Sequence, residues 1–183
     1  MSAPTSIQPT THTHLSSVRQ YYEQNTRLFR ALGNDRAMHT IHRAIWAEGV
    51  ADLESALNYS GQLILNEIRA YERERPAYPL TVLDLGCGVG GSLFYLARHL
   101  PPPTRLVGLT LSPTQAQWAG QSARRLGLES SSVFVEGDFL NLPVSTSVDA
   151  AFAIEAFAHA PDPARFFEQV ARPQARRATD AIG

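Results

Sequence analysis

The ten residues VLDLGCGVGG, numbered Val82–Gly91, combine a short apolar run with four closely spaced glycines. A run such as Thr81–Leu85 predicts a strand that is buried on both faces, as strands of parallel sheets are. Glycines directly after a strand permit a tight turn and let a ligand approach the backbone closely. The stretch therefore predicts a strand, a ligand-binding loop and the start of a helix.

Alternating strand and helix patterns follow this loop and predict a doubly wound, parallel α/β sheet with right-handed crossovers. Ser112 is expected to cap one helix, with Pro113 in its first position and Gln115 completing a capping box. Asp162 is expected to cap another. The expected strands cover residues 81–85, 105–109, 133–136 and 149–154, and the expected helices cover 92–100, 113–126 and 163–170.

The N-terminal part of the chain has a different character. Residues 1–15 are rich in Ser, Thr, Pro and His and are predicted to form a disordered arm. Residues 16–76 predict a helical region, and Pro76 ends its last helix. The expected helices of this region cover residues 16–32, 40–46 and 52–74. The core is expected at 77–172, and an irregular tail at 173–183.

Composition excludes several classes of protein. A chain of 183 residues is expected to form about one domain. Its 16 basic residues, all arginine, face 17 acidic ones, so no basic surplus favours nucleic acid. The single cysteine excludes an internal disulfide framework and suggests a reducing compartment. No apolar run is long enough to span a membrane. We therefore expect a soluble, cytoplasmic protein without stable membrane insertion.

The glycines allow two kinds of ligand besides a purely structural turn. Gly86, Gly88 and Gly91 satisfy the G-x-G-x-x-G pattern of dinucleotide sites. Such a site requires an acidic residue about twenty positions later, and residues 107–111 contain none. Asp84 would also repel a pyrophosphate. A cationic ligand without phosphates suits the loop better, and S-adenosylmethionine, with a sulfonium and an ammonium, is such a ligand.

The segment from Thr81 to about Val170 resembles the class I S-adenosylmethionine-dependent methyltransferases, because three motifs occur in that family's order. VLDLGCGVGG resembles the loop for the methionine end of the cofactor. GLTLSPTQ at Gly108–Gln115 resembles the second motif, and EGDF at Glu136–Phe139 the third. The resemblance implies a Rossmann-like fold and the cofactor-binding residues Asp84, Gly86, Gly88, Gly90, Thr110, Leu111, Gln115, Asp138 and Phe139.

The second and third motifs each have a structural alternative. Thr110 and Gln115 match residues of the cyclopropane-fatty-acid and tocopherol-type branches and would hydrogen-bond the ribose or methionine part. Helix capping is the other role open to them. Asp138 would accept a hydrogen bond from the adenine amino group while Phe139 packs on the ring. A plain Gly-Asp turn is the alternative for Asp138.

The eleven residues FAIEAFAHAPD, Phe152–Asp162, resemble the acidic, histidine-containing motif of sterol and related isoprenoid C-methyltransferases. Glu155 and His159 are the candidate catalytic residues, because a base must remove a proton after a methyl group joins an alkene. The same base would deprotonate an oxygen or nitrogen acceptor. A loop histidine that caps a carbonyl is the alternative for His159.

The helical region at 16–76 resembles the N-terminal lid of small-molecule methyltransferases. Four aromatic residues are candidates to line an apolar acceptor pocket, namely Tyr21, Tyr22, Trp46 and Phe157, with ordinary helix packing as the favoured alternative for Tyr21 and Tyr22. No metal site is expected at His39 and His42, since companion ligands are lacking.

These observations predict methylation of a small lipophilic acceptor, isoprenoid or sterol-like, at carbon. The alternatives are O- or N-methylation of a small metabolite, a non-catalytic fragment, and, less favoured, a dinucleotide oxidoreductase.

The length bears on this choice. The resembling family has seven strands, and only about four are expected here. Relatives continue with Arg-Pro-Gly-Gly and a fifth strand, whereas Arg172-Pro173 is followed by the polar QARRATDAIG. We therefore expect a truncated methyltransferase whose strand at 149–154 forms an uncovered sheet edge. Such an edge could pair with a second copy of the chain.

Overall fold

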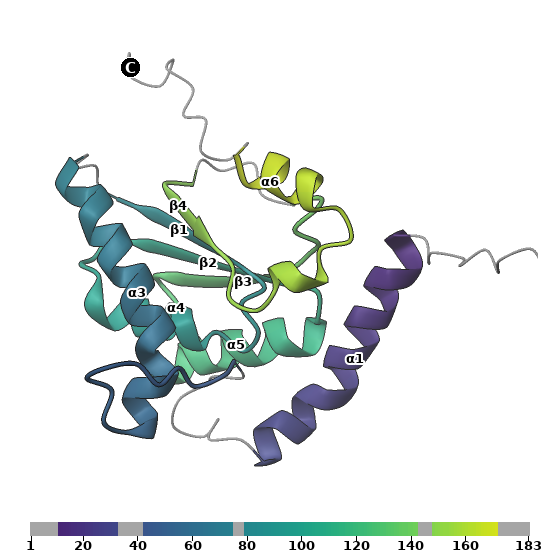
Figure 1. Ribbon diagram of the computed structural model, residues 1–183, viewed down its shortest axis with the longest axis horizontal. Helices are drawn as coiled ribbons and strands as arrows, with labels where there is room; N and C mark the ends of the chain where they lie inside the picture. Colours follow the sequence, from purple (N-terminus) through teal and green to yellow (C-terminus); the bar gives the residue numbers. More distant parts are fainter. Residues whose placement is uncertain (1–10, 33–41, 75–78, 143–147, 172–183) are drawn as a thin grey trace, which may run out of the picture.

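The computed structural model describes residues 11–32, 42–74, 79–142 and 148–171. The strands of a single sheet alternate with helices along the core, as the sequence pattern predicts (Figure 1). The elements in chain order are α1 (Thr11–Leu32), α3 (Leu53–Glu74), β1 (Thr81–Leu85), α4 (Gly91–His99), β2 (Arg105–Thr110), α5 (Pro113–Leu126), β3 (Ser132–Glu136), β4 (Ala150–Phe152), the 3-10 helix η1 (Phe157–His159) and α6 (Pro163–Ala171).

The sheet contains four parallel strands in the order β3-β2-β1-β4. Leu83 at the centre of β1 lies opposite Val107 of β2 and Ala151 of β4. All five residues of β1 are buried, because helices cover both faces of this central strand. The order confirms the doubly wound sheet and places β4 at one edge of the described strands.

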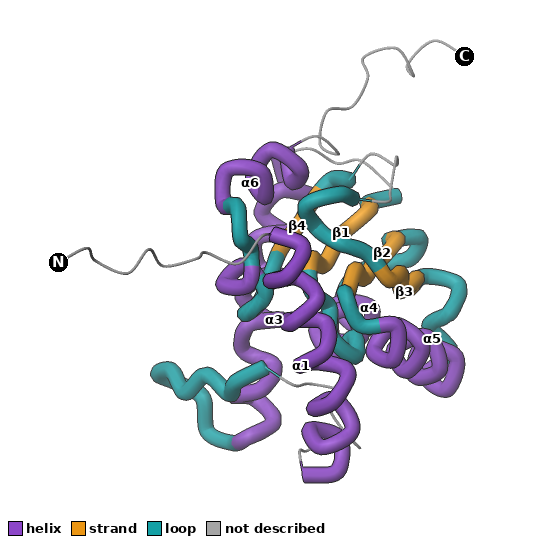
Figure 2. Tube along the Cα trace, turned by 90° about the vertical axis from the view of Figure 1, so that its right-hand side faces the viewer, coloured by secondary structure: helices purple, strands orange, loops and turns teal. Residues whose placement is uncertain are grey.

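Two apolar clusters hold the helices on the sheet. Val82 joins the cluster beneath α3 and α4, to which α3 contributes Leu65 and Ile68. Leu83 belongs to the cluster on the opposite face, together with Phe166 of α6. The turned view in Figure 2 shows the four strands between α6 on one side and α4 and α5 on the other.

The N-terminal region differs from the expectation in two places. Helix α1 begins at Thr11, so the predicted arm of residues 1–15 is wrong for its last five residues. Thr and His reduce helix stability by less than about 1 kcal/mol each, which allows the helix to extend towards the N-terminus. The expected helix at 40–46 is also wrong for residues 42–46. There the backbone N–H of Ile45 bonds the carbonyl of Ala56, at 2.9 Å, instead of a helical partner.

The other elements agree with the prediction to within a few residues. Asp52 caps α3, since its carboxylate accepts the backbone N–H of Ser55 at 2.7 Å. Strand β4 is shorter than the expected 149–154. The proposed tail at 173–183 lies outside the described residues. Of the helices that the structure describes, none has the length and apolar character needed to cross a membrane.

Candidate cofactor and acceptor site

A cavity of about 360 Å³ lies at the carboxyl ends of β1 and β2, above the glycine loop. This is the end of an open parallel sheet at which ligands bind. Most of the predicted site residues line it, although they come from four separate segments of the chain. They are Asp84, Gly86, Gly88, Thr110, Leu111, Gln115, Phe139, Glu155 and His159. Gly90 and Asp138 are not among the lining residues.

The glycine loop is held tightly against β2 and the segment after β4. The backbone N–H groups of Gly86 and Cys87 both donate to the carbonyl of Leu109, at 2.8 Å each. Gly86 has a φ of 105°, and a Cβ there would lie 2.2 Å from the Cβ of Ala156. Gly90 precedes α4 with a φ of 95°, and its absent Cβ leaves room for packed phenyl rings. Gly90 therefore shapes the loop from behind, without lining the cavity.

Asp84 is the most unusual titratable group at the cavity wall. Its side chain is 2% exposed, and its Oδ1 has no hydrogen-bond partner in the described part of the chain. Burial raises the pKa of this carboxyl group from 3.8 to about 8. A buried carboxyl oxygen without a donor is costly unless a ligand supplies one. The wall is therefore suited to a ligand that brings a positive charge or an N–H group.

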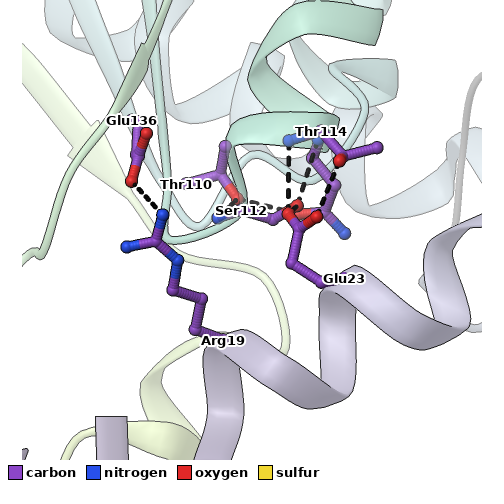
Figure 3. A network of polar contacts seen from close by, with 7 residues as sticks. Arg19, Glu23, Thr110, Ser112, Thr114 and Glu136 are labelled. Carbon is purple, nitrogen blue, oxygen red and sulfur yellow. Dashed lines mark hydrogen bonds and ion pairs between the residues drawn. The ribbon is translucent and has the colours of Figure 1, made fainter. Parts of the chain in front are cut away.

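Helix α1 is anchored across this end of the sheet by Glu23 (Figure 3). Its carboxylate accepts the hydroxyl hydrogen of Ser112 and two hydrogen bonds from Thr114, one from the backbone N–H at 3.2 Å and one from the hydroxyl at 2.6 Å. Burial acts to raise the pKa of Glu23, but these hydrogen bonds and the positive charge of Arg19 together lower it. Arg19 forms a second link, an ion pair with Glu136 at 2.7 Å.

Thr110 and Gln115 are connected to α1 as well as to each other. The Thr110 hydroxyl donates to Oε1 of Gln115 at 2.7 Å, and Nε2 of Gln115 donates to the hydroxyl of Thr26 at 3.0 Å. Ser112 does accept the Gln115 backbone N–H, at 3.1 Å, so the predicted cap is confirmed. The reciprocal half of the capping box is wrong, because the Ser112 N–H bonds the Thr110 hydroxyl instead.

Asp138 occupies a turn beside the cavity. Its carboxylate accepts the backbone N–H of Leu140 at 2.8 Å and the amide of Asn141 at 3.3 Å. This geometry is that of the plain turn, and the adenine-binding role of Asp138 stays a prediction. The neighbouring Phe139 is buried and lines the cavity, and its ring meets Phe166 edge to face with centroids 5.2 Å apart.

The two candidate catalytic residues face α1 and the segment before α3. His159 lies at the end of η1, and its Nε2 is 3.0 Å from the Tyr22 hydroxyl. Glu155 has a φ of 54°, a left-handed conformation that is uncommon for a residue with a side chain. Its Oε1 accepts the backbone N–H of Arg43 at 3.1 Å. Residues separated by more than a hundred positions thus meet on this side of the cavity.

The expected apolar acceptor pocket is only partly present. Tyr21 and Tyr22 line the cavity, but Trp46 and Phe157 do not, so that part of the prediction is wrong. Trp46 is 61% exposed, on the segment that is not helical. The Phe157 ring packs on α6, 5.0 Å from Phe166 between centroids. Within the described ranges, no three metal-ligating side chains cluster.

Sequence reasoning also missed the α1 residues that hold the site together. Glu23 and Thr26 lie about ninety positions from their partners at the start of α5. Their positions on one helix face are visible in the sequence, but a local pattern does not show what such a face meets.

Comparison with known proteins agrees with this geometry. Residues 82–174 match the family model described as "Methyltransferase domain". The chain belongs to this methyltransferase family. The match begins at Val82, on the strand that leads into the glycine loop, and the expected Rossmann-like methyltransferase fold is confirmed.

Individual relatives cover different parts of the chain. It is 42% identical to 24-methylenesterol C-methyltransferase 2 of Oryza sativa subsp. japonica over 81 residues, which are 44% of this chain and 22% of that protein. It is 36% identical to norajmaline N-methyltransferase of Rauvolfia serpentina over 95 residues, 51% of this chain and 32% of that protein. The chain thus spans at most a third of these two relatives.

A solved structure extends the likeness into the N-terminal region. The cyclase SpnF superimposes with a TM-score of 0.69 at 26% identity, covering 90% of this chain and 56% of SpnF. The likeness to SpnF therefore extends to the helices before β1.

Proposed function

We propose that this chain is an S-adenosylmethionine-dependent methyltransferase that methylates a small lipophilic acceptor, isoprenoid or sterol-like, at carbon. The observation that carries the cofactor is the buried Oδ1 of Asp84, which lacks a partner in the described structure and belongs to the wall of the cavity. The ammonium group of S-adenosylmethionine would supply the missing hydrogen bond and charge. A dinucleotide would instead bring a pyrophosphate towards this carboxyl group.

The rest of the cavity suits the remaining parts of that cofactor. The polar groups of Thr110 and Gln115 line the β2 side, and the ring of Phe139 lines the wall after β3. Thr110, Leu111 and Gln115 are assigned to the ribose or methionine part, and Phe139 to the adenine ring. The bound sulfonium activates its methyl group for displacement. What remains for the protein is alignment of the acceptor and exclusion of water.

Glu155 and His159 are assigned to proton removal on the acceptor side, since both line the same cavity as the glycine loop. Addition of a methyl group to an alkene leaves a carbocation, which a carboxylate stabilises and which a base converts to product by removing a proton. The relative whose name specifies a sterol C-methyltransferase, at 42% identity, supports carbon as the site of transfer.

A second candidate is methylation of oxygen or nitrogen in a more polar acceptor. It is favoured by the acceptor side itself, where His42, Arg43 and the Tyr22 hydroxyl line the cavity while Trp46 and Phe157 do not. A relative named as an N-methyltransferase matches the chain at 36% identity. The same pair of residues would deprotonate such an acceptor.

Calorimetric titration of the full chain with S-adenosylmethionine and with NAD tests the cofactor. We expect binding of S-adenosylmethionine but not of NAD. Asp84→Asn should weaken this binding at least about tenfold, because the lost hydrogen bond between the ammonium group and a carboxylate is worth more than about 1.4 kcal/mol. Asp162→Asn, which changes an exposed helix cap outside the cavity, is the matched control. Tighter binding of NAD, or unchanged affinity in Asp84→Asn, would overturn the assignment.

Labelled S-adenosylmethionine and an acceptor panel test the reaction. Transfer to prenyl diphosphates or sterols supports carbon methylation, whereas transfer only to phenols or amines supports the second candidate. Glu155→Gln should lower turnover about 100-fold or more if its carboxylate acts in proton removal. Glu168→Gln, an exposed substitution on α6, provides the control. Full turnover by Glu155→Gln removes the residue from the mechanism.

A further inference from the structure

Tyr22 of α1 makes a specific contact with the candidate base His159. The Tyr22 hydroxyl lies 3.0 Å from Nε2 of His159, and the two rings meet edge to face with centroids 5.6 Å apart. Both side chains are partly buried and line the cavity. The contact joins positions 137 residues apart, so it exists only when α1 is docked over the sheet.

The chemistry of the two groups determines which one donates. An imidazole nitrogen is a far better base than a phenol oxygen, and a phenol is a strong neutral donor. Burial raises the pKa of Tyr22, and Tyr21 and Glu155 add to the rise, so the phenol keeps its proton at neutral pH. These properties favour the hydroxyl as the donor and Nε2 as the acceptor.

This arrangement limits how His159 can act as a base. A neutral imidazole has one nitrogen that carries hydrogen and one that accepts, so acceptance at Nε2 places the hydrogen on Nδ1. No second lone pair is then left for the acceptor. A proton from the cavity can reach Nε2 only through the oxygen of Tyr22.

We propose that Tyr22 is the proton relay of this site, an inference that rests on the proposed methyl transfer. The acceptor gives its proton to the Tyr22 oxygen while the phenol hydrogen moves to Nε2 of His159. The new bond between the acceptor and the methyl carbon forms as the carbon–sulfur bond breaks, and that electron pair stays on sulfur. The positive charge of the sulfonium ends on the imidazolium, and Tyr22 is again a neutral phenol.

The relay is also connected to the cofactor side of the cavity through one turn of α1. The backbone carbonyl of Tyr22 accepts the hydroxyl hydrogen of Thr26, and Thr26 in turn accepts from Nε2 of Gln115 at 3.0 Å. Gln115 is bonded to Thr110, a residue assigned to the cofactor. The position of Tyr22 over His159 therefore depends on the same polar contacts that shape the cofactor side.

The tautomer of His159 tests the hydrogen bond without turnover. Nitrogen-15 correlation spectra of the full chain, recorded at about pH 8 where an ordinary histidine is neutral, show which ring nitrogen carries hydrogen. The signal that disappears in His159→Gln identifies the residue. We expect hydrogen on Nδ1 in the native protein and a shift towards Nε2 in Tyr22→Phe. Tyr95→Phe removes a comparable hydroxyl, bonded to Gln62 at 2.6 Å outside this cavity, and should leave the signal unchanged.

Kinetics with the acceptor that the panel identifies test the relay itself. In Tyr22→Phe we expect kcat to fall at least about tenfold while KM changes less than about twofold, because only the proton path is lost. Hydrogen on Nε2 in the native protein, or full kcat in Tyr22→Phe, overturns the relay even in an active methyltransferase. Transfer to no acceptor contradicts the proposed function instead, and the tautomer measurement separates the two failures.

Discussion

Replacing Asp84 with asparagine should alter how the stability of the free protein depends on pH. The carboxyl group is 2% exposed with an unpartnered Oδ1 among the described residues, and its pKa is raised from 3.8 to about 8 by burial. The folded chain therefore holds this proton more tightly than the unfolded chain does. The stabilisation of the folded state by this bound proton is complete below pH 3.8 and is lost as the pH rises to about 8. Asparagine has nearly the same shape and no such titration.

The size of the effect follows from the pKa difference. One pKa unit corresponds to about 1.4 kcal/mol. The free energy of unfolding of the native protein therefore falls by about that amount for each pH unit between 3.8 and about 8. Between pH 5 and pH 7 the free energy of unfolding of Asp84→Asn should therefore rise by about 3 kcal/mol relative to the native protein. Above about pH 8 the difference should level off.

Urea denaturation of both proteins at pH 5, 6 and 7 measures this difference directly. Titrations elsewhere in the chain are common to both proteins and cancel when the free energies are subtracted. Asp162→Asn, at an exposed helix cap, should follow the native pH dependence. A difference between Asp84→Asn and the native protein that stays constant across this range, or one of opposite sign, would refute the reasoning.

Two further predictions concern the glycine loop and the anchoring of α1. Gly86→Ala should lower the free energy of unfolding by more than about 2 kcal/mol, because the added methyl would lie 2.2 Å from the Cβ of Ala156. Gly127→Ala would place its methyl group in open space, at a φ of 69° that residues with a side chain adopt more readily than the 105° of Gly86, and should lose only about 1 kcal/mol. Urea denaturation measures both losses, and equal losses would contradict this argument. Glu23→Gln should lower the thermal midpoint more than Arg19→Met does, because Glu23 accepts three hydrogen bonds and Arg19 forms an exposed ion pair. Scanning calorimetry compares them, and a larger loss in Arg19→Met would contradict the ranking.

Much of the core could be predicted because its signals are local. The apolar run before Gly86 and the glycines after it specify strand β1 and the turn into α4 within ten residues. Ser112 followed by Pro113 marks the start of α5, and the structure places the cap there. These patterns depend on backbone hydrogen bonds within a turn or two, so tertiary contacts change their boundaries by only a residue or two.

The errors lie where distant contacts outweigh local preference. Residues 42–46 have a short helical pattern, but Arg43 and Ile45 donate their backbone N–H groups to Glu155 and Ala56. A helix of so few residues is unstable alone, and these partners determine its backbone. Trp46, which would have faced the cavity in the expected helix, is consequently exposed.

The division of the site between the two parts of the chain has a consequence for specificity. The family model begins at Val82, and the glycine loop, the β2 motif and the candidate bases all lie within it. Tyr22, His42 and Arg43 come from outside that range and complete the acceptor side. Under the proposed function, cofactor binding and proton removal depend on the first set, whereas the shape and polarity offered to the acceptor depend on the second. Substitutions in α1 and residues 42–43 are then where a change of acceptor would arise, with the glycine loop and the β2 motif left unchanged.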